Sequence, residues 1–280
     1  MLPPMAMDSS SLQVAAVQLS SAEDVPENLA RVNELVHEAA SRGAQMVVLP
    51  ENFAFLGPEP LKRSHAEKLG DFDAPIQGAV RRLAKELSIT IVAGGFPEAS
   101  GDPERPFNTC AVLGPTGELL ASYRKIHLFD VELSDGTVLA ESEATTGGEG
   151  AVVVEVGGFR VGLSICYDLR FPELYRALSD QGAEVLLVPA AFTLQTGKDH
   201  WHVLLRARAI ESQSWVVAAG QWGKHTRGRA SYGHSLVADP WGLVVAECSD
   251  GLGVVTAELT RELLERVRGS VPSLRHRRIR

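Results

Sequence analysis

Val-Gly-Leu-Ser-Ile-Cys-Tyr-Asp-Leu-Arg-Phe-Pro-Glu, residues 161–173, joins an apolar run to a polar turn. Residues 159–165 have the composition of a buried strand, and the segment from Pro172 onward is typical of a helix. A nucleophile at such a corner projects out of the sheet, and backbone N–H groups of the turn can bind an oxyanion. Cys166 is therefore a candidate nucleophile.

Two other apolar runs end on residues that suit the same chemistry. Residues 45–50, Gln-Met-Val-Val-Leu-Pro, precede Glu51, and residues 119–124, Leu-Leu-Ala-Ser-Tyr-Arg, precede Lys125. A carboxylate, an ammonium group and a thiol, each just past an apolar strand, are the parts of a thiol-based acyl-transfer site. Taken singly, each residue is more often a packed small side chain or a solvated loop charge.

Three motifs resemble the signatures of the nitrilase superfamily of carbon–nitrogen hydrolases. They are Leu-Pro-Glu-Asn-Phe at 49–53, Tyr-Arg-Lys-Ile-His-Leu-Phe-Asp at 123–130 and Cys-Tyr-Asp-Leu-Arg-Phe-Pro-Glu at 166–173. Their order and spacing also match, and the resemblance extends from about Leu12 to the C-terminal helix. The joint occurrence of the motifs favours functional roles for the thiol, the acid and the amine. The resemblance implies an amidase that needs no metal and no cofactor.

Amide hydrolysis gives each of these residues an expected role. Cys166 would attack the carbonyl carbon as a thiolate and form a thioester. Glu51 would take the thiol proton, pass it to the departing nitrogen and then activate water. Lys125 and the backbone N–H of Tyr167 would stabilise the oxyanion. Glutamate in place of histidine as the base is unusual, and the resemblance is the reason to expect it here.

Further site residues follow from the resemblance. Glu141 is similar to an additional glutamate that family members place beside the lysine, although Glu143 is close enough in sequence to be the alternative. His127 is expected to line the pocket or to support the loop. Phe192 and Thr196 match positions that line the pocket in the family.

Arg170 is the best indication of the substrate. A guanidinium group beside the nucleophile can bind a carboxylate through two hydrogen bonds. The alternative is that Arg170 pairs with Asp168 or Glu173 and only holds the local turn. In the family, arginine at this position accompanies ω-amidases that act on amides of α-keto acids.

The C-terminal third of the chain narrows the choice of expected substrate. Residues 218–242 resemble the branch of deaminated-glutathione amidases more than the branch of α-ketoglutaramate ω-amidases. A ring of polar groups could accommodate a longer peptide-like substrate, although surface placement is the rival interpretation; its members are His225, Arg227, Arg229 and Tyr232. Deaminated glutathione is the first choice of substrate and α-ketoglutaramate the second. A non-catalytic scaffold that keeps the fold is the alternative from a different class.

Composition limits the remaining possibilities. The 280 residues carry a net charge of −8, and a pI of about 5.5 argues against nucleic acid as a partner. No apolar run approaches the ~20 residues that span a bilayer, and the N-terminus lacks the pattern of a secretory signal. Cys110 and Cys248 are expected to be buried, inert thiols, which favours a reducing, cytoplasmic location. His200 and His202 alternate on a helix, so that pair is a poor metal site.

Strands and helices are mixed throughout the chain, without a linker or an internal repeat. We therefore expect a loose tail over residues 1–10 and a single domain of mixed α/β class over residues 11–280. Residues 126–150 are polar and lack periodicity, which indicates a long functional loop. The pattern suggests two sheets with helices outside, and the resemblance implies a four-layer α-β-β-α sandwich that forms a homodimer or a higher homo-oligomer.

Overall fold

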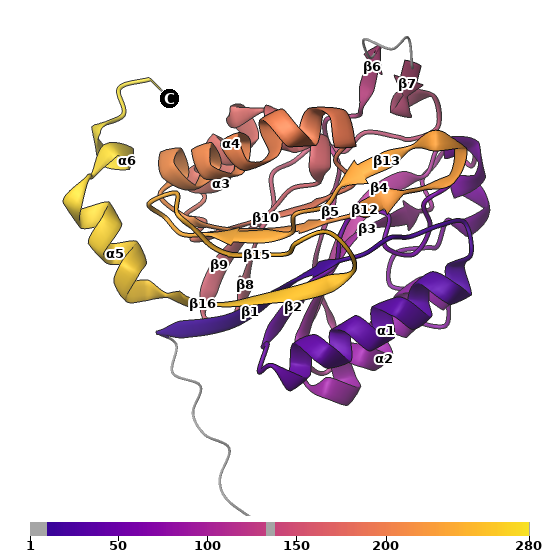
Figure 1. Cartoon of the computed structure of the whole chain (residues 1–280), viewed down its shortest axis with the longest axis horizontal. Coiled ribbons are helices and arrows are strands. Elements are labelled where there is room, and N and C mark those ends of the chain that lie inside the picture. Colours follow the sequence, from indigo (N-terminus) through magenta and orange to yellow (C-terminus); the bar gives the residue numbers. More distant parts are fainter. Residues whose placement is uncertain (1–9, 133–137, 280) are drawn as a thin grey trace, which may run out of the picture.

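The computed structural model describes residues 10–132 and 138–279. Two six-stranded sheets lie face to face, and helices cover their outer faces (Figure 1). The order of strands in the first sheet is β16 (Gly253–Thr260), β1 (Ser11–Gln18), β2 (Met46–Val48), β3 (Thr90–Glu98), β4 (Phe107–Leu113) and β5 (Leu119–Arg124). In the second it is β15 (Val244–Glu247), β14 (Leu236–Ala238), β11 (Trp215–Gly220), β10 (Val185–Ala190), β9 (Phe159–Leu163) and β8 (Val153–Val156).

Each sheet has a parallel centre. Strands β1, β2 and β3 run parallel, and so do β9, β10 and β11, whereas the outer pairs are antiparallel. Parallel strands need crossover connections, and helices supply them here. Helices α1 (Val25–Ser41) and α2 (Pro75–Leu87) cover the first sheet, and α3 (Pro172–Asp180) and α4 (Leu194–Ser212) cover the second.

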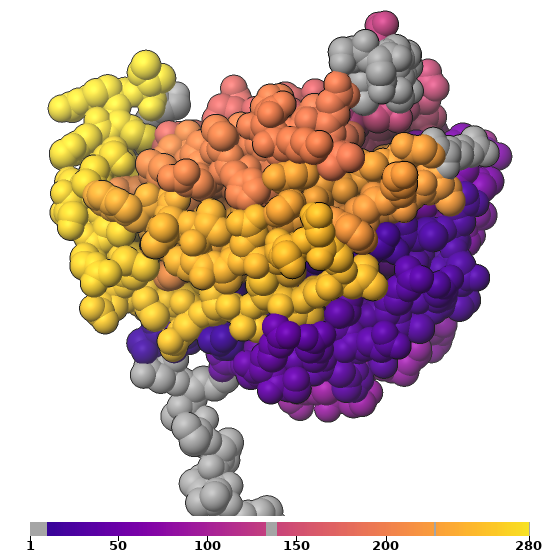
Figure 2. Space-filling model, viewed as in Figure 1, coloured from indigo at the N-terminus to yellow at the C-terminus, as the bar shows by residue number. Residues whose placement is uncertain are grey.

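The helices begin where local chemistry allows it. The Asp24 carboxylate accepts a hydrogen bond of 2.9 Å from the N–H of Glu27, which caps α1. Thr260 caps α5 (Arg261–Ser270) in the same way, as its hydroxyl accepts from Leu263. In Figure 2, α5 and α6 (Ser273–His276) form one end of the molecule.

Two apolar layers hold the four structural layers together. One lies between the sheets and beneath α3 and α4, where Trp201, Leu205 and Ala209 present one buried helix face. The other lies between the first sheet and α1 with α2. The mixed α/β class and the four-layer sandwich expected from the sequence are confirmed. Cys110 and Cys248 are both buried and free, as expected.

Several local expectations differ from the structure. The segment 126–150 is not a plain loop, because it contains the two-stranded ladder of β6 (Asp130–Glu132) and β7 (Val138–Ala140) and a 3-10 turn. A second small ladder joins β12 (Trp222–Lys224) to β13 (Ala230–Tyr232). Of the tail expected over residues 1–10, only Ser10 is among the described residues. No helix in the described ranges is both long and apolar enough to cross a membrane.

Candidate active site

The ends of four strands meet at one place between the two sheets. Strand β2 ends just before Glu51, β5 ends at the residue before Lys125, β9 leads into Cys166 and β10 ends before Ala191. All four of these residues line one pocket. The sandwich therefore brings together side chains that are far apart in the sequence.

The Glu51 carboxylate is buried and receives hydrogen bonds on both oxygens. Its Oε1 accepts from Lys125 Nζ at 3.0 Å and from Asn108 Nδ2 at 2.9 Å, and its Oε2 accepts from the N–H of Ala191 at 2.9 Å. The Cys166 thiol also hydrogen-bonds to this carboxylate. Glu51 thus has a fixed orientation and lies within proton-transfer reach of the thiol.

Backbone geometry leaves room for this carboxylate. Between Ala93 and Phe96 the register of β3 against β4 shifts, and Gly95 lies in the shift. A Cβ atom on Gly95 would lie 2.8 Å from Asn108 Oδ1 and 3.2 Å from Glu51 Cγ. A glycine is therefore needed here because two side chains of the site approach the backbone closely.

Lys125 lies between two carboxylates. Its Nζ donates to Glu141 Oε2 at 2.7 Å as well as to Glu51, and it is only 2% exposed. Glu141 is buried and also accepts from the N–H of Phe129 at 2.8 Å. Glu143 is exposed, and the structure places Glu141, not Glu143, beside the amine.

Cys166 stands at a strained corner between β9 and α3. It begins the 3-10 turn Cys166–Arg170, and its φ of 48° lies in the left-handed region that non-glycine residues rarely adopt. Asp168 braces the corner, since its Oδ2 accepts from the N–H of Ile165 at 2.9 Å and from the Tyr123 hydroxyl at 2.7 Å. The strain is thus supported by buried hydrogen bonds.

Charges around the pocket decide the protonation states. Burial by itself raises the pKa of Glu51, but the positive charges of Lys125 and Lys62 outweigh burial and lower it. Burial and the Glu51 charge raise the pKa of Cys166 well above its ordinary value, against the effect of Lys125. Burial works against the ammonium form of Lys125, yet Glu141 and Glu51 raise its pKa well above normal. At rest the site holds a carboxylate, an ammonium group and a neutral thiol.

The expected substrate-binding residues line the mouth of the same pocket. Arg170, Phe192 and Thr196 are all lining residues, together with Tyr167. The Arg170 guanidinium lies 5.0 Å from the centre of the Phe192 ring, and its Nη1 lies 3.2 Å from His200 Nδ1. Among the described residues no carboxylate forms an ion pair with it, which leaves the local-turn alternative without support.

The other candidates, with the exception of Arg229, are not among the residues that line the pocket. His127 stacks on Phe171 with ring centres 3.7 Å apart, and its Nδ1 contacts Asp168 Oδ1 at 2.7 Å, an arrangement that suits a supporting role. Of the polar ring, Arg229 lines the pocket and pairs with Glu59 at 2.9 Å. His225 instead bridges Ser21 and Ser231, and Tyr232 stacks on His234. The side chain of Arg227 lies outside the described part of the structure.

Sequence reasoning missed three polar residues of this site. Asn108 donates to Glu51 and, at 3.4 Å, to Glu141 Oε1, so it bridges the two carboxylates. Glu59 and Lys62 form an ion pair at the rim of the pocket. The available signal for Asn108 was an amide near the start of an otherwise apolar strand, where a buried polar group needs partners.

Comparisons with known proteins agree with this geometry. The model of the carbon–nitrogen hydrolase family matches residues 13–269. A protein of Synechocystis sp. named deaminated glutathione amidase is 45% identical over 266 residues, which cover 94% of this chain and 97% of that protein. The human protein of the same name is 43% identical over 284 residues, covering 98% of this chain and 85% of that protein.

Solved structures lead to the same family. The NitFhit protein of Caenorhabditis elegans superposes with a TM-score of 0.90 at 39% identity, over 96% of this chain and 65% of that longer chain. Nit3 of Saccharomyces cerevisiae, described as a member of the nitrilase superfamily, gives a TM-score of 0.87 at 32% identity, over 96% of this chain and 97% of that chain. This chain therefore belongs to the carbon–nitrogen hydrolase family of the nitrilase superfamily.

Proposed function

We propose that this chain is an amidase that hydrolyses deaminated glutathione through a thioester on Cys166. The observation that carries the proposal is the convergence of a thiol, a hydrogen-bonded carboxylate and a buried ammonium group in one pocket. Deaminated glutathione has a keto group in place of the glutamyl amino group. Hydrolysis of its side-chain amide would release a dicarboxylic α-keto acid and the amine of cysteinylglycine.

In the first half of the reaction, Glu51 removes the thiol proton as Cys166 Sγ attacks the amide carbon. The C–S bond forms, and the carbonyl π electrons move onto oxygen. Because Glu51 is ionised and Cys166 is a neutral thiol at rest, the proton moves in the direction that the resting charges allow. Glu51 then delivers this proton to the amine nitrogen, the C–N bond breaks and a thioester remains.

The oxyanion needs positive partners while it exists. Lys125 supplies a full charge, and Glu141 and Glu51 hold its Nζ from two sides. The backbone N–H of Tyr167, the residue after the nucleophile, is the second proposed donor. Glu141 is thus a positioning residue that acts through Lys125.

Water completes the cycle. Glu51 removes a proton from a water molecule, the hydroxide attacks the thioester carbon, and the C–S bond breaks as the sulfur leaves. The proton held by Glu51 returns to the sulfur, so the acid product departs and the resting thiol and carboxylate are restored. One carboxylate can act as base and acid in turn because the water would attack the thioester carbon from the position that the amine has left, within reach of Glu51.

Arg170 is proposed to bind a carboxylate of the substrate. Its guanidinium lines the pocket beside the Phe192 ring, and because only Nη1 contacts His200, its other nitrogens are the donors proposed for the ligand. Phe192 and Thr196 would contact the chain between that carboxylate and the scissile amide. Arg229, already paired with Glu59, also lines the pocket and is proposed to contact a peptide-like leaving group.

Named relatives support the reaction class. Deaminated glutathione amidases from a cyanobacterium and from mammals align over 94% or more of this chain. An amidase from Nesterenkonia sp., 27% identical with a TM-score of 0.78, is described with acrylamide added to its active-site cysteine. That adduct supports the proposed nucleophilic role of Cys166.

The deciding experiment compares kcat/KM for deaminated glutathione and α-ketoglutaramate on the full chain. We expect the first to be preferred, with a dicarboxylic α-keto acid released from both substrates. The Cys166→Ala variant should lose turnover while keeping the melting temperature. Negligible rates on both substrates would refute the substrate proposal, and unchanged activity in Cys166→Ala would refute the nucleophile.

A homodimer is proposed as the assembly state. Large apolar side chains are exposed on α4 and on the turn between β14 and β15, including Val203, Trp241 and Leu243 at 65%, 61% and 62%. If these side chains pair with their copies across a two-fold axis, the dimer would remove them from water. Sedimentation at micromolar concentration tests this, because a single species of about 30 kDa, the mass of one chain, would contradict it.

A further inference from the structure

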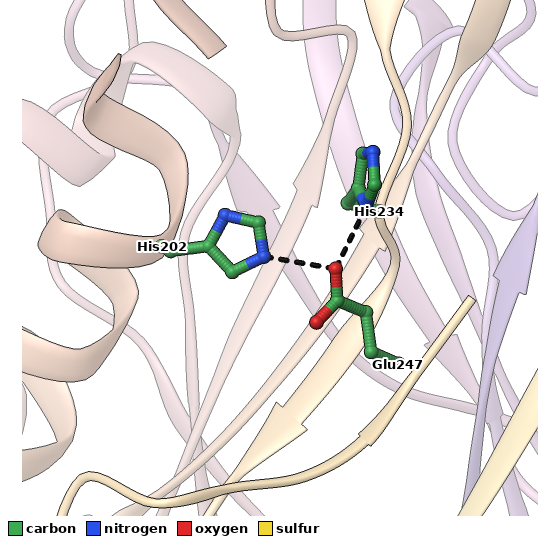
Figure 3. A group of neighbouring side chains, drawn as sticks. All are labelled: His202, His234 and Glu247. Carbon is green, nitrogen blue, oxygen red and sulfur yellow. Dashed lines mark hydrogen bonds and ion pairs between the residues drawn. The ribbon is translucent and has the colours of Figure 1, made fainter. Parts of the chain in front are cut away.

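Three side chains with metal-ligand chemistry meet outside the active-site pocket. His202 comes from α4, His234 from the connection between β13 and β14, and Glu247 from the end of β15 (Figure 3). One ligand atom from each lies within 4.8 Å of the others. None of these three residues lines the active-site pocket, so the cluster is separate from the proposed amidase chemistry.

Both imidazoles point at the same carboxylate oxygen. His202 Nε2 lies 2.9 Å and His234 Nδ1 lies 2.7 Å from Glu247 Oε1. Two imidazoles and one carboxylate form a ligand set that protein zinc sites use when they keep a fourth position open. With zinc–ligand bonds of about 2.0–2.1 Å in tetrahedral geometry, the ligand atoms would be about 3.3 Å apart. The two N–O distances would therefore lengthen by about half an ångström, and the two ligand nitrogens, which lie within 4.8 Å of each other, would settle at the same spacing.

Partial exposure makes this small change accessible. The side chains of His202, His234 and Glu247 are 31%, 25% and 33% exposed, so solvent ions can reach them and the rings can rotate slightly. The backbone around His234 is held more firmly. Its φ is 56°, and its carbonyl accepts a hydrogen bond of 2.8 Å from Trp201 Nε1.

A second carboxylate lies near the other ring nitrogen of His234. Asp250 Oδ1 lies 3.7 Å from His234 Nε2 and accepts from Trp222 Nε1 at 3.3 Å. A metal-bound histidine usually directs its other N–H to a carboxylate, which fixes the tautomer. In the metal-free cluster His234 donates from Nδ1. Metal binding at Nδ1 would move that proton to Nε2, where Asp250 is placed to receive the hydrogen bond.

We propose that His202, His234 and Glu247 form a binding site for a divalent transition metal, with Zn²⁺ as the best match. The metal would replace the two N–H···O contacts by three coordinate bonds and leave one position for water. It would join α4, which carries Thr196 of the pocket, to the edge strand β15. The site lies apart from the active-site pocket, and the proposal does not depend on the proposed amidase reaction.

The test measures Zn²⁺ binding directly. The full chain carrying Cys166→Ala, so that the active-site thiol cannot bind zinc, is stripped with EDTA and titrated with ZnCl₂ by calorimetry. We expect one zinc per chain and a rise in melting temperature on saturation. His234→Gln and Glu247→Gln in the same background should weaken binding by roughly 100-fold or more. Asp250→Asn, a change at an exposed second carboxylate, should weaken it by about 10- to 100-fold.

His37→Gln is the matched control. His37 also contacts a carboxylate, Glu86 at 3.2 Å, but it belongs to no three-residue cluster among the described residues. This variant should bind zinc like the parent. Co²⁺ in place of Zn²⁺ should give visible absorption bands that His234→Gln abolishes. The proposal fails if the parent binds no zinc, or if Asp250→Asn and His234→Gln both bind it with parental stoichiometry and affinity.

Discussion

Lys125 Nζ lies 2.7 Å from Glu141 Oε2, closer than the 3.0 Å that separates it from the Glu51 oxygen. The amine is therefore held as firmly by a residue outside the three motifs as by the expected base. Without Glu141, a buried ammonium group would have one carboxylate for both its charge and its orientation. Glu51 would then have to orient the Lys125 side chain as well as transfer protons.

Replacing Glu141 by glutamine should slow chemistry more than binding. The substitution removes one negative charge beside Lys125 and keeps the shape of the side chain. We expect kcat to fall by about 100- to 1,000-fold, the usual effect of losing one oxyanion donor, with a much smaller change in KM. Steady-state kinetics at several pH values would measure this.

Glu143→Gln is the control for that substitution. Glu143 is two residues away and exposed, so its loss should leave kcat/KM within a factor of two or so of the parent. Equal defects in the two variants would show that the effect comes from the 3-10 turn as a whole. The positioning role of Glu141 would then be wrong.

The close approach of the Gly95 backbone to Glu51 gives a second prediction. An alanine at Gly95 would place its Cβ 2.8 Å from Asn108 Oδ1 and 3.2 Å from Glu51 Cγ, so one of these side chains must shift. A displacement of about 1 Å in a reacting group can cost on the order of 100-fold in rate. We expect Gly95→Ala to fold and to lose kcat by about 10- to 100-fold, measured with melting curves in parallel. Gly101→Ala, where no heavy atom lies within 4 Å of the added Cβ, should behave as wild type.

The resting charges predict a broad pH profile. The pKa of Glu51 is lowered below 4.5, and the pKa of Cys166 is raised well above 9.0. Activity needs Glu51 ionised, so it is lost only as the pH falls through the lowered carboxyl pKa. Because the pKa of the Cys166 thiol is raised well above its ordinary value by burial and by the Glu51 charge, the thiol stays protonated over the neutral range. We expect kcat/KM to be flat between about pH 5 and pH 9. An acid limb near pH 6.5, the ordinary histidine value, would contradict Glu51 as the base.

Much of this site was predictable because the sandwich places its chemistry at strand ends. Glu51, Lys125 and Cys166 each follow a short apolar strand, and family motifs surround them, so local sequence was sufficient to propose them together. Glu141 and Glu143 could not be separated in this way. Both stand in one short turn, and only the tertiary contact with Lys125 distinguishes them.

Other features had a weak local signal or none. Asn108 lies in β4 among apolar residues, and its function depends on carboxylates from two distant segments. Strands β6 and β7 are three residues each, too short to show alternation. Helix α4 begins at Leu194, and no side chain caps its N-terminus, so the sequence carries no capping signal that marks the start of this helix. Tertiary packing determines these features. Neither the helix and strand propensities of the residues nor the periodicity of the hydrophobic positions carries information about that packing.

The ion pairs that Glu59 forms in the pocket lining predict a pH-dependent contribution to the free energy of unfolding. Glu59 is partly buried between Lys62 and Arg229; burial opposes its ionisation, but these two cations lower its pKa to about 2. A carboxyl with a lowered folded-state pKa stabilises the fold above its unfolded pKa. That contribution is lost as the pH falls from the unfolded value of 4.5 through about 2.

Glu59→Gln should therefore lower the free energy of unfolding by about 2 kcal/mol at pH 7, after allowance for partial exposure. The difference from wild type should shrink to less than half of that at pH 3. Urea unfolding at the two pH values measures it. Glu262→Gln, at a side chain that is 88% exposed, serves as the control and should change stability little at either pH. A difference that stays constant with pH would mean that the ion pairs contribute nothing.

Arg170 gives a prediction about specificity. Its guanidinium faces the pocket mouth beside Phe192 and, in the described ranges, has no carboxylate partner of its own. A hydrogen bond to a charged group contributes about 1.5–3 kcal/mol, so Arg170→Gln should lower kcat/KM for deaminated glutathione by roughly 10- to 150-fold. The loss should appear mainly in KM. Arg170→Lys should recover only part of it, because an ammonium group cannot make the paired hydrogen bonds of a guanidinium.

The decisive comparison uses a substrate analogue in which the carboxylate at the α-keto acid end is replaced by a methyl amide. Wild type and Arg170→Gln should hydrolyse this analogue at similar rates, because the interaction that the arginine supplies is already absent. Arg176→Gln, an arginine of α3 that pairs with Glu211 away from the pocket, should leave both substrates unaffected. If Arg170→Gln weakened the acid and the analogue equally, the arginine would be supporting the Cys166 turn, and substrate selection would have to depend on Arg229, the other arginine of the pocket lining.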